Sequence, residues 1–169
     1  MTNSSCPSGQ GFDSASSKAV EVTKVVVVNN YHADYAYTLN GAQVVVGDSS
    51  DAFDPANHQC GDTIEKLSAG ESHSLLCRIP GRYIFVRVPP QRSTELYIAE
   101  VIVEIDNVEF TGGISRSSSL ATTARPASNA RDQDAGTITS IGYYSKPWWR
   151  LDTGITSSLT GSTIDDGVC

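Results

Sequence analysis

Three oxygen-bearing side chains at close spacing, Asn129, Asp132 and Asp134, have the chemistry of metal ligands. They follow the pattern Asn-x-x-Asp-x-Asp in a predicted loop. Calcium takes roughly six to eight oxygen ligands, and an irregular loop can turn several such oxygens toward one point. The pattern therefore indicates a calcium site. The alternative is that both aspartates are solvated turn residues.

A further carboxylate, Glu100, lies inside the apolar stretch 96–105, which we interpret as a strand. A charged group within an apolar strand needs a partner, usually a cation or an arginine. A bound cation would neutralise Glu100. An ion pair with Arg131 or Arg150 is the alternative.

Aromatic and ionisable side chains crowd into another short stretch, which contains Tyr31, His32, Asp34, Tyr35 and Tyr37. Aromatic faces beside a carboxylate and an imidazole could bind a sugar. An aromatic patch for protein contact, or tyrosines that cover the end of the fold, explains the same composition. Tyrosine is enriched at interfaces, so composition alone does not favour a pocket over a contact surface.

Both tryptophans of the chain, Trp148 and Trp149, follow Pro147 and precede Arg150. Neighbouring residues of a strand point to opposite faces of its sheet. One indole would therefore fill a core, where its large apolar area stabilises the fold. The other would cover a loop or offer a flat surface on which a sugar could stack.

The elements that must position these residues are predicted to be short strands. Runs of β-branched and alternating apolar residues predict strands at 20–28, 42–46, 75–79, 82–88 and 96–105. Polar stretches at 48–62 and 111–128 predict loops, and no convincing amphipathic helix is found. Together these predict an all-β sandwich or jelly roll over residues 19–154. Residues 1–18 form a Ser/Gly-rich arm and residues 155–169 a weakly patterned tail.

Composition restricts the function classes. The chain has 169 residues and a formal net charge of -7, which argues against nucleic acid and anionic membranes as partners. It contains no run of about 20 apolar residues, so membrane insertion is not expected. The histidines His32, His58 and His73 have neither a nucleophile motif nor metal-ligand spacing, so we predict no enzymatic activity.

The four cysteines form an even set without a zinc-type spacing: Cys6, Cys60, Cys77 and Cys169. In a β-rich chain with many serines and threonines, such a set favours two disulfides and a secreted or cell-surface protein. Four free thiols in a reducing compartment are the alternative.

Several motifs together resemble the F-type lectins, a discoidin-like family of jelly-roll sandwiches that bind fucose. The residues that carry the resemblance are Pro147-Trp148-Trp149-Arg150-Leu151-Asp152, Gly81-Arg82-Tyr83-Ile84, Leu96-Tyr97-Ile98-Ala99-Glu100-Val101, Cys60-Gly61 with Cys77, and Pro126-Ala127-Ser128-Asn129-Ala130-Arg131-Asp132. Residues 19–106 match the family's later part, and residues 107–154 match its beginning. The resemblance therefore implies a circularly permuted member of the family.

The resemblance also implies how the cysteines pair. Cys60 and Cys77 fall where the family places a disulfide. Permutation would open the chain between the Trp-Trp segment and the valine-rich strand, and Cys6 and Cys169 lie in the two flanking tails. We expect these two to pair and close the opening. In the alternative, the arms join neighbouring chains by domain swapping or in a filament.

The calcium ligands implied by the family are Asn129, Asp132, Asp134, the Ala99 carbonyl, Glu100 and a hydroxyl at Ser140. Its fucose-binding residues do not carry over: Tyr31 and Thr38 stand where two arginines are expected, and Tyr143 stands near an expected histidine. We therefore expect a calcium-stabilised lectin-like module for another glycan, with Tyr143 near the tyrosine-rich stretch. A structural subunit that self-associates through its arms is the alternative.

Overall fold

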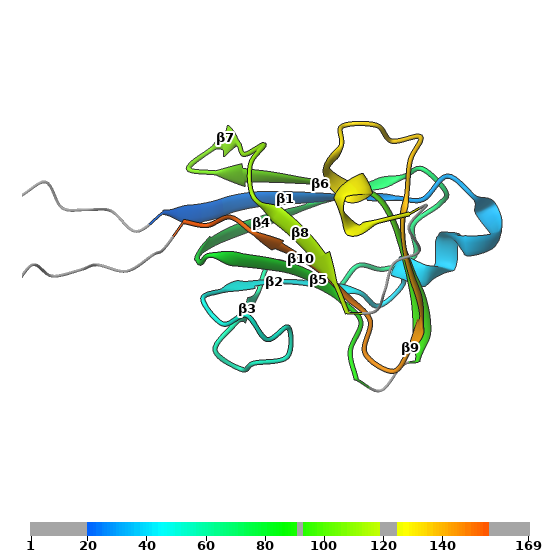
Figure 1. The fold of residues 1–169 in the computed structure, drawn as a ribbon, viewed down its shortest axis with the longest axis horizontal. Coiled ribbons are helices and arrows are strands. Elements are labelled where there is room, and N and C mark those ends of the chain that lie inside the picture. Colours follow the sequence, from blue (N-terminus) through cyan, green and yellow to red (C-terminus); the bar gives the residue numbers. More distant parts are fainter. Residues whose placement is uncertain (1–19, 91–92, 119–124, 156–169) are drawn as a thin grey trace, which may run out of the picture.

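The computed structural model describes residues 20–90, 93–118 and 125–155, which form two antiparallel β-sheets and two short 3-10 helices (Figure 1). The N-terminal arm and most of the C-terminal tail, with Cys6 and Cys169, lie outside the described residues. The all-β sandwich predicted from the strand pattern is thus confirmed.

The first sheet has the order β4 (Ser72–Pro80), β1 (Glu21–Asn29), β6 (Thr94–Ile105) and β7 (Val108–Glu109), and β9 (Thr139–Tyr144) also pairs with β6. The second sheet has the order β3 (His58–Gln59), β2 (Gln43–Gly47), β5 (Tyr83–Arg87), β10 (Trp148–Asp152) and β8 (Ile114–Ser117). The 3-10 helices are η1 (Ala33–Leu39) and η2 (Ala127–Arg131).

Two of these strands were predicted to be loop. Strand β3 has two residues, both exposed, and so carries no apolar alternation. In β8 the positions opposite the buried Leu151 and Trp149 of β10 are Ser115 and Ser117. The serines occupy the places where alternation would put apolar residues, so the pattern did not predict this strand.

The core lies between the sheets and is built from alternate residues of each strand, such as Val25 and Val27 in β1 and Ile84 and Val86 in β5. Trp149 is completely buried in this core. Trp148 faces the other way and packs edge-on against Phe85 with ring centroids 6.1 Å apart. The prediction that the two indoles face opposite sides of their sheet is therefore confirmed.

Strand β6 changes the side it presents to the core halfway along its length. Leu96 and Ile98 face the core before the change, and Val101 and Val103 face it afterwards. The register with β1 shifts at this point, which leaves Ala99 as an extra residue, as in a β-bulge. The bulge turns Glu100 onto the outer face of the first sheet.

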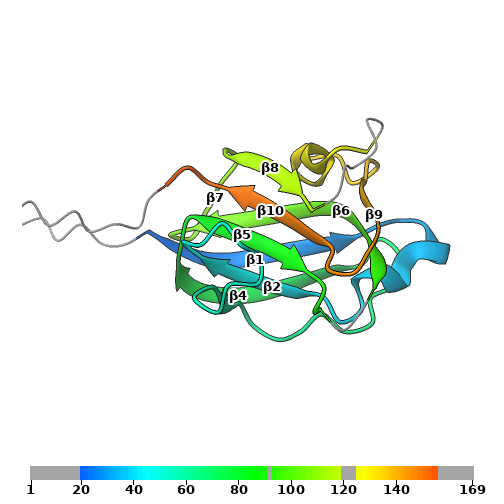
Figure 2. The same ribbon diagram turned by 60° about the horizontal axis from the view of Figure 1, so that its bottom comes forward.

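The ends of the described body lie side by side at one end of the sandwich, where β1 begins and β10 ends (Figures 1 and 2). Strands β6 and β7 are joined by the two-residue turn Asp106-Asn107, whose φ values are 50° and 66°. Positive φ at both central residues is the signature of the type I′ hairpin turn.

A disulfide joins Cys60 to Cys77, with a Cα–Cα distance of 4.6 Å. Cys60 follows β3 of the second sheet and Cys77 lies in β4 of the first, so the bond links the two sheets. The pairing implied by the resemblance is confirmed. Within the described residues, no helix has the length and apolar character needed to cross a membrane.

Candidate functional site

The acidic loop 132–137 follows helix η2, and three hydrogen bonds to other parts of the chain hold that helix. The indole Nε1 of Trp149 donates to the Ala127 carbonyl at 2.9 Å. The backbone N–H of Ala130 donates to the Thr139 hydroxyl at 3.0 Å. The Asn129 amide donates to the Ile138 carbonyl at 3.1 Å. The core and β9 therefore fix the start of the loop.

The oxygens of this loop gather around one hydroxyl. The Thr137 Oγ1 lies 2.7 Å from Asp132 Oδ2, 3.0 Å from the Asp134 carbonyl and 3.5 Å from the Asn129 carbonyl. One hydroxyl carries one proton, so it can satisfy only one of these three acceptors. Oxygens from three residues of the loop therefore lie close to the Thr137 hydroxyl, an arrangement that a hard cation could also use.

Glu100 links the first sheet to this loop. Its side chain is only 7% exposed, and its Oε2 accepts a hydrogen bond from the backbone N–H of Gln133 at 3.1 Å. Burial, and next the charge of Asp132, raise the pKa of Glu100, while Arg131 opposes the shift. Among the described residues neither Arg131 nor Arg150 forms an ion pair with it. Glu100 is thus a buried carboxylate that has a backbone hydrogen bond and the charge of Arg131 nearby, but no direct ion pair among the described residues.

The ligand set proposed from the sequence is brought together in part. Asn129, Asp132 and Asp134 surround Thr137, and Glu100 reaches the same loop through Gln133. Ser140 lies opposite Tyr97 in the β9–β6 register, and the two side chains are hydrogen-bonded. Its role as a ligand stays a prediction.

The chemistry of these residues fits calcium, because every candidate donor is a hard oxygen. In the described part of the chain, no three His, Cys, Asp or Glu side chains converge on one point. A cation here would need main-chain carbonyls and a hydroxyl beside the carboxylates. The hydroxyl of Thr137 was not predicted as a ligand, although its position at the end of the acidic stretch 129–137 could have indicated it.

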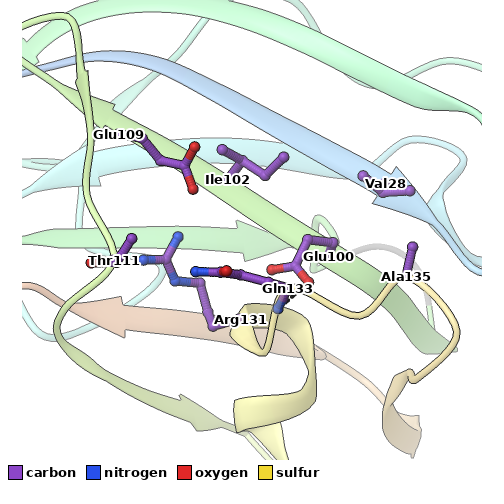
Figure 3. A pocket seen from close by; sticks show the side chains of 8 residues that line it. All are labelled: Val28, Glu100, Ile102, Glu109, Thr111, Arg131, Gln133 and Ala135. Atoms are coloured by element: carbon purple, nitrogen blue, oxygen red, sulfur yellow. Dashed lines mark hydrogen bonds between the residues drawn. The ribbon is translucent and has the colours of Figure 1, made fainter.

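A cavity of about 350 Å³ lies beside the acidic loop, on the outer face of the first sheet (Figure 3). Val28 and Ile102 form an aliphatic floor, because they lie on the outward side of β1 and β6. The remaining lining residues come from β6, from β7 and the segment after it, and from η2 and the acidic loop: Glu100, Glu109, Thr111, Arg131, Gln133 and Ala135. The cavity therefore combines carboxylates, a guanidinium, an amide and a hydroxyl above an apolar surface.

Arg131 holds one wall of the cavity in place. The edge of β6 is unpaired between β9 and β7, and Arg131 Nη1 donates there to the Val101 carbonyl at 2.9 Å. Its Nη2 donates to the Phe110 carbonyl, while its buried Nε has no acceptor. Desolvation lowers the pKa of Arg131, and Glu100 and Glu109 oppose that shift. Arg131 thus serves mainly as a link between strands.

The tyrosine-rich stretch lies at the end of β1 and in η1, where buried asparagines hold its backbone. Asn30 Nδ2 donates to the Tyr35 carbonyl at 3.0 Å. The rings of Tyr31 and His32 are 4.3 Å apart, and Tyr35 stacks on Tyr97 at 5.0 Å. Tyr31 is 48% exposed. This end of the sandwich therefore presents an aromatic surface to solvent.

The other residues proposed for that ligand site are spread around this surface. Tyr37 lines a separate groove of about 310 Å³ together with residues 66–69, and Asp34 is exposed. Tyr143 is 73% exposed and makes no ring contact with any described aromatic side chain. The structure thus gathers Tyr31, His32 and Tyr35 but does not join all six residues in one pocket.

The fold and the site define an all-β sandwich with a cavity on one outer face. No family model, no curated protein and no solved structure matches this chain.

Proposed function

We propose that this protein is a calcium-stabilised, non-enzymatic binding module of the lectin type, secreted or on a cell surface, which takes a saccharide in the cavity beside the acidic loop. The observation that carries the proposal is the composition of that cavity. Glu100 and Glu109 can accept hydrogen bonds from sugar hydroxyls, and Gln133 and Thr111 can donate to them. The aliphatic floor suits the apolar face of a sugar ring.

Calcium supports this function by neutralising the acidic wall. Asp132 and Glu100 would supply carboxylates, and Asn129, Asp134 and Ala99 would supply carbonyls. A hydroxyl would come from Thr137 or Ser140. The bound ion supplies positive charge, so Glu100 can stay ionised in its buried position. The loop then keeps Gln133 at the cavity.

The resemblance of the Trp-Trp, Gly-Arg-Tyr and Ala-Ser-Asn-Ala segments to F-type lectins is consistent with this proposal. Fucose binding of the usual kind is not proposed, because Tyr31 and Thr38 stand where that family has arginines. The disulfide is compatible with an oxidising compartment outside the cell.

A glycan array, probed with the full chain in calcium and again in EDTA, tests the proposal. We expect binding to a defined set of saccharides that is lost in EDTA. Glu109→Gln should weaken it, because Glu109 is an exposed cavity residue with no structural hydrogen bond from its side chain among the described residues. Tyr31→Ala, at the aromatic end, is the matched control and should leave it unchanged. If the protein binds no glycan on the array, the proposal is contradicted. If only Tyr31→Ala loses glycan binding, the saccharide site lies at the tyrosine-rich end instead.

A structural subunit is the second candidate, supported by the exposed aromatic surface of Tyr31, Tyr35 and Tyr37 and by the start of β1 and the end of β10, which lie side by side. Such a subunit would self-associate through its arms. Light scattering at micromolar protein separates a polymer from a monomer. Peptide mass analysis with and without reduction shows whether Cys6 pairs with Cys169 of the same chain.

A further inference from the structure

The outer face of the second sheet carries two arginines that lie directly opposite each other, Arg116 of β8 and Arg150 of β10. Direct cross-strand partners have Cβ atoms about 4.5–5.5 Å apart, and like charges in this position destabilise a sheet. We propose that this arginine pair binds the oxyanion of an acidic saccharide, in the form of a sulfate or carboxylate group.

Neither guanidinium forms a direct ion pair within the described residues, although Asp152, which is paired with Arg82, lies near enough for the charge of Arg150 to lower its pKa. The ion pairs found there are Lys24–Glu104 and Arg82–Asp152, so no carboxylate lies within 4.0 Å of Arg116 or Arg150. Arg116 is exposed, and its side chain makes no hydrogen bond to the described residues. Its charge is therefore available to a ligand.

Arg150 is held rigidly for such a role. Its Nη1 donates to the Ser50 carbonyl at 2.9 Å, and its buried Nε has no acceptor in the part of the chain that the structure describes. Its guanidinium carbon lies 5.1 Å from the centre of the Tyr83 ring and 5.7 Å from that of Trp148. A guanidinium fixed between two aromatic rings loses little side-chain freedom when it binds an anion.

Charge complementarity argues for an anionic ligand. The protein carries a net charge of -7, yet this face also bears other basic side chains that lie against aromatic rings. Arg87 and Lys146 lie over the ring of Phe53 at 5.3 Å and 5.6 Å. Arg87 has Asp51 near it as a favourable charge.

A saccharide is the carrier that suits the surroundings of the pair. Tyr83 and Trp148 are both partly exposed beside Arg150, and Ile114 of the edge strand is 62% exposed. Sugar rings present an apolar face to such surfaces, while their acidic groups take charge-assisted, two-point hydrogen bonds from guanidinium groups. The site lies on the opposite sheet from the cavity, so it does not rest on the proposed function.

Fluorescence titration of the full chain tests this proposal, because Trp148 lies beside Arg150 while Trp149 is buried. The probes are a sulfated dextran oligosaccharide, an oligogalacturonate, neutral dextran and an oligoglutamate peptide. At least one of the two acidic saccharides should bind and change the emission, and its affinity should fall as salt rises. Binding of one but not the other assigns the oxyanion as sulfate or carboxylate.

Arg116→Gln should weaken that binding roughly tenfold or more, because it removes a charge-assisted donor. Arg116→Lys keeps the charge but lacks the planar guanidinium, so its affinity should lie between that of the unchanged protein and that of Arg116→Gln. The matched control is Arg78→Gln, which removes one exposed arginine from β4 of the other sheet and should change affinity less than about twofold. Urea midpoints equal to that of the unchanged protein show that the variants fold.

The proposal is overturned if neither acidic saccharide binds, if Arg116→Gln and Arg78→Gln lose affinity equally, or if oligoglutamate binds as tightly as the saccharides. A variant Arg116→Gln that aggregates while it keeps full affinity also overturns it, and assigns Arg116 to protection of the β8 edge.

Discussion

Replacing Trp149 by phenylalanine removes the hydrogen bond that joins the core to helix η2, which leads into the acidic loop. Trp149 is completely buried, and its indole N–H donates to Ala127 at 2.9 Å. The lost hydrogen bond is worth about 1 kcal/mol, and the cavity left by the smaller ring about 1–2 kcal/mol more. The hydroxyl of Thr139 lies 3.3 Å from the Ala127 carbonyl but is closer to the Pro126 carbonyl, at 2.9 Å, so it replaces the indole donor only in part. We therefore expect the free energy of unfolding in urea to fall by about 2–3 kcal/mol.

The matched control is Trp148→Phe, one residue away on the other face of β10. Trp148 is half-buried and packs edge-on against Phe85. Its replacement should cost less than about 1 kcal/mol, because part of the lost area already faces water. Trp149→Phe should also weaken calcium binding, whereas Trp148→Phe should not. Equal losses of stability in the two variants would refute the reasoning that one indole is structural and the other peripheral.

Three further changes test the contacts that hold the sandwich and the cavity wall together. Breaking the Cys60–Cys77 disulfide, which closes a separation of 17 residues, should lower the free energy of unfolding by about 3 kcal/mol in urea denaturation. Hydrogen bonding from Arg82 lowers the pKa of Asp152, so the stability from this pair is present above the ordinary aspartate pKa of about 3.9 and is lost as pH falls through the lowered value. Asp152→Asn should therefore flatten the decline in thermal midpoint below about pH 4, and an unchanged acid profile would contradict this. Arg131→Met removes the donors to the part-buried carbonyls of Val101 and Phe110 and should cost about 2–4 kcal/mol by urea denaturation, so a loss under about 0.5 kcal/mol would show that water replaces them.

Much of the sandwich could be predicted from local sequence, because its long strands carry a clear apolar pattern. The valine run of β1 and the alternation in β5 identified two central strands. The short edge strands could not be predicted in this way. His58 and Gln59 of β3 are both exposed, and β8 presents Ser115 and Ser117 on its inward side, so tertiary pairing alone makes these segments strands.

The acidic part of the site could be predicted, because Asn129, Asp132 and Asp134 are close in sequence and share one loop. The cavity could not, because its walls meet only after folding. Glu100 faces outward because of the bulge at Ala99, and no apolar period predicts a bulge. Arg131 reaches the unpaired edge of β6, which exists only because β7 and β9 pair with opposite ends of that strand.

Calcium titration by calorimetry, followed by thermal melts of the same samples, tests the central claim most directly. Ligand at about 100 times its dissociation constant should stabilise the fold by about 2.7 kcal/mol. For a chain of this size that corresponds to a rise of about 5–10 °C in thermal midpoint. Magnesium should not replace calcium, and Glu100→Gln should abolish the response. A midpoint that stays the same in calcium and in EDTA would contradict a cation held between the acidic loop and Glu100.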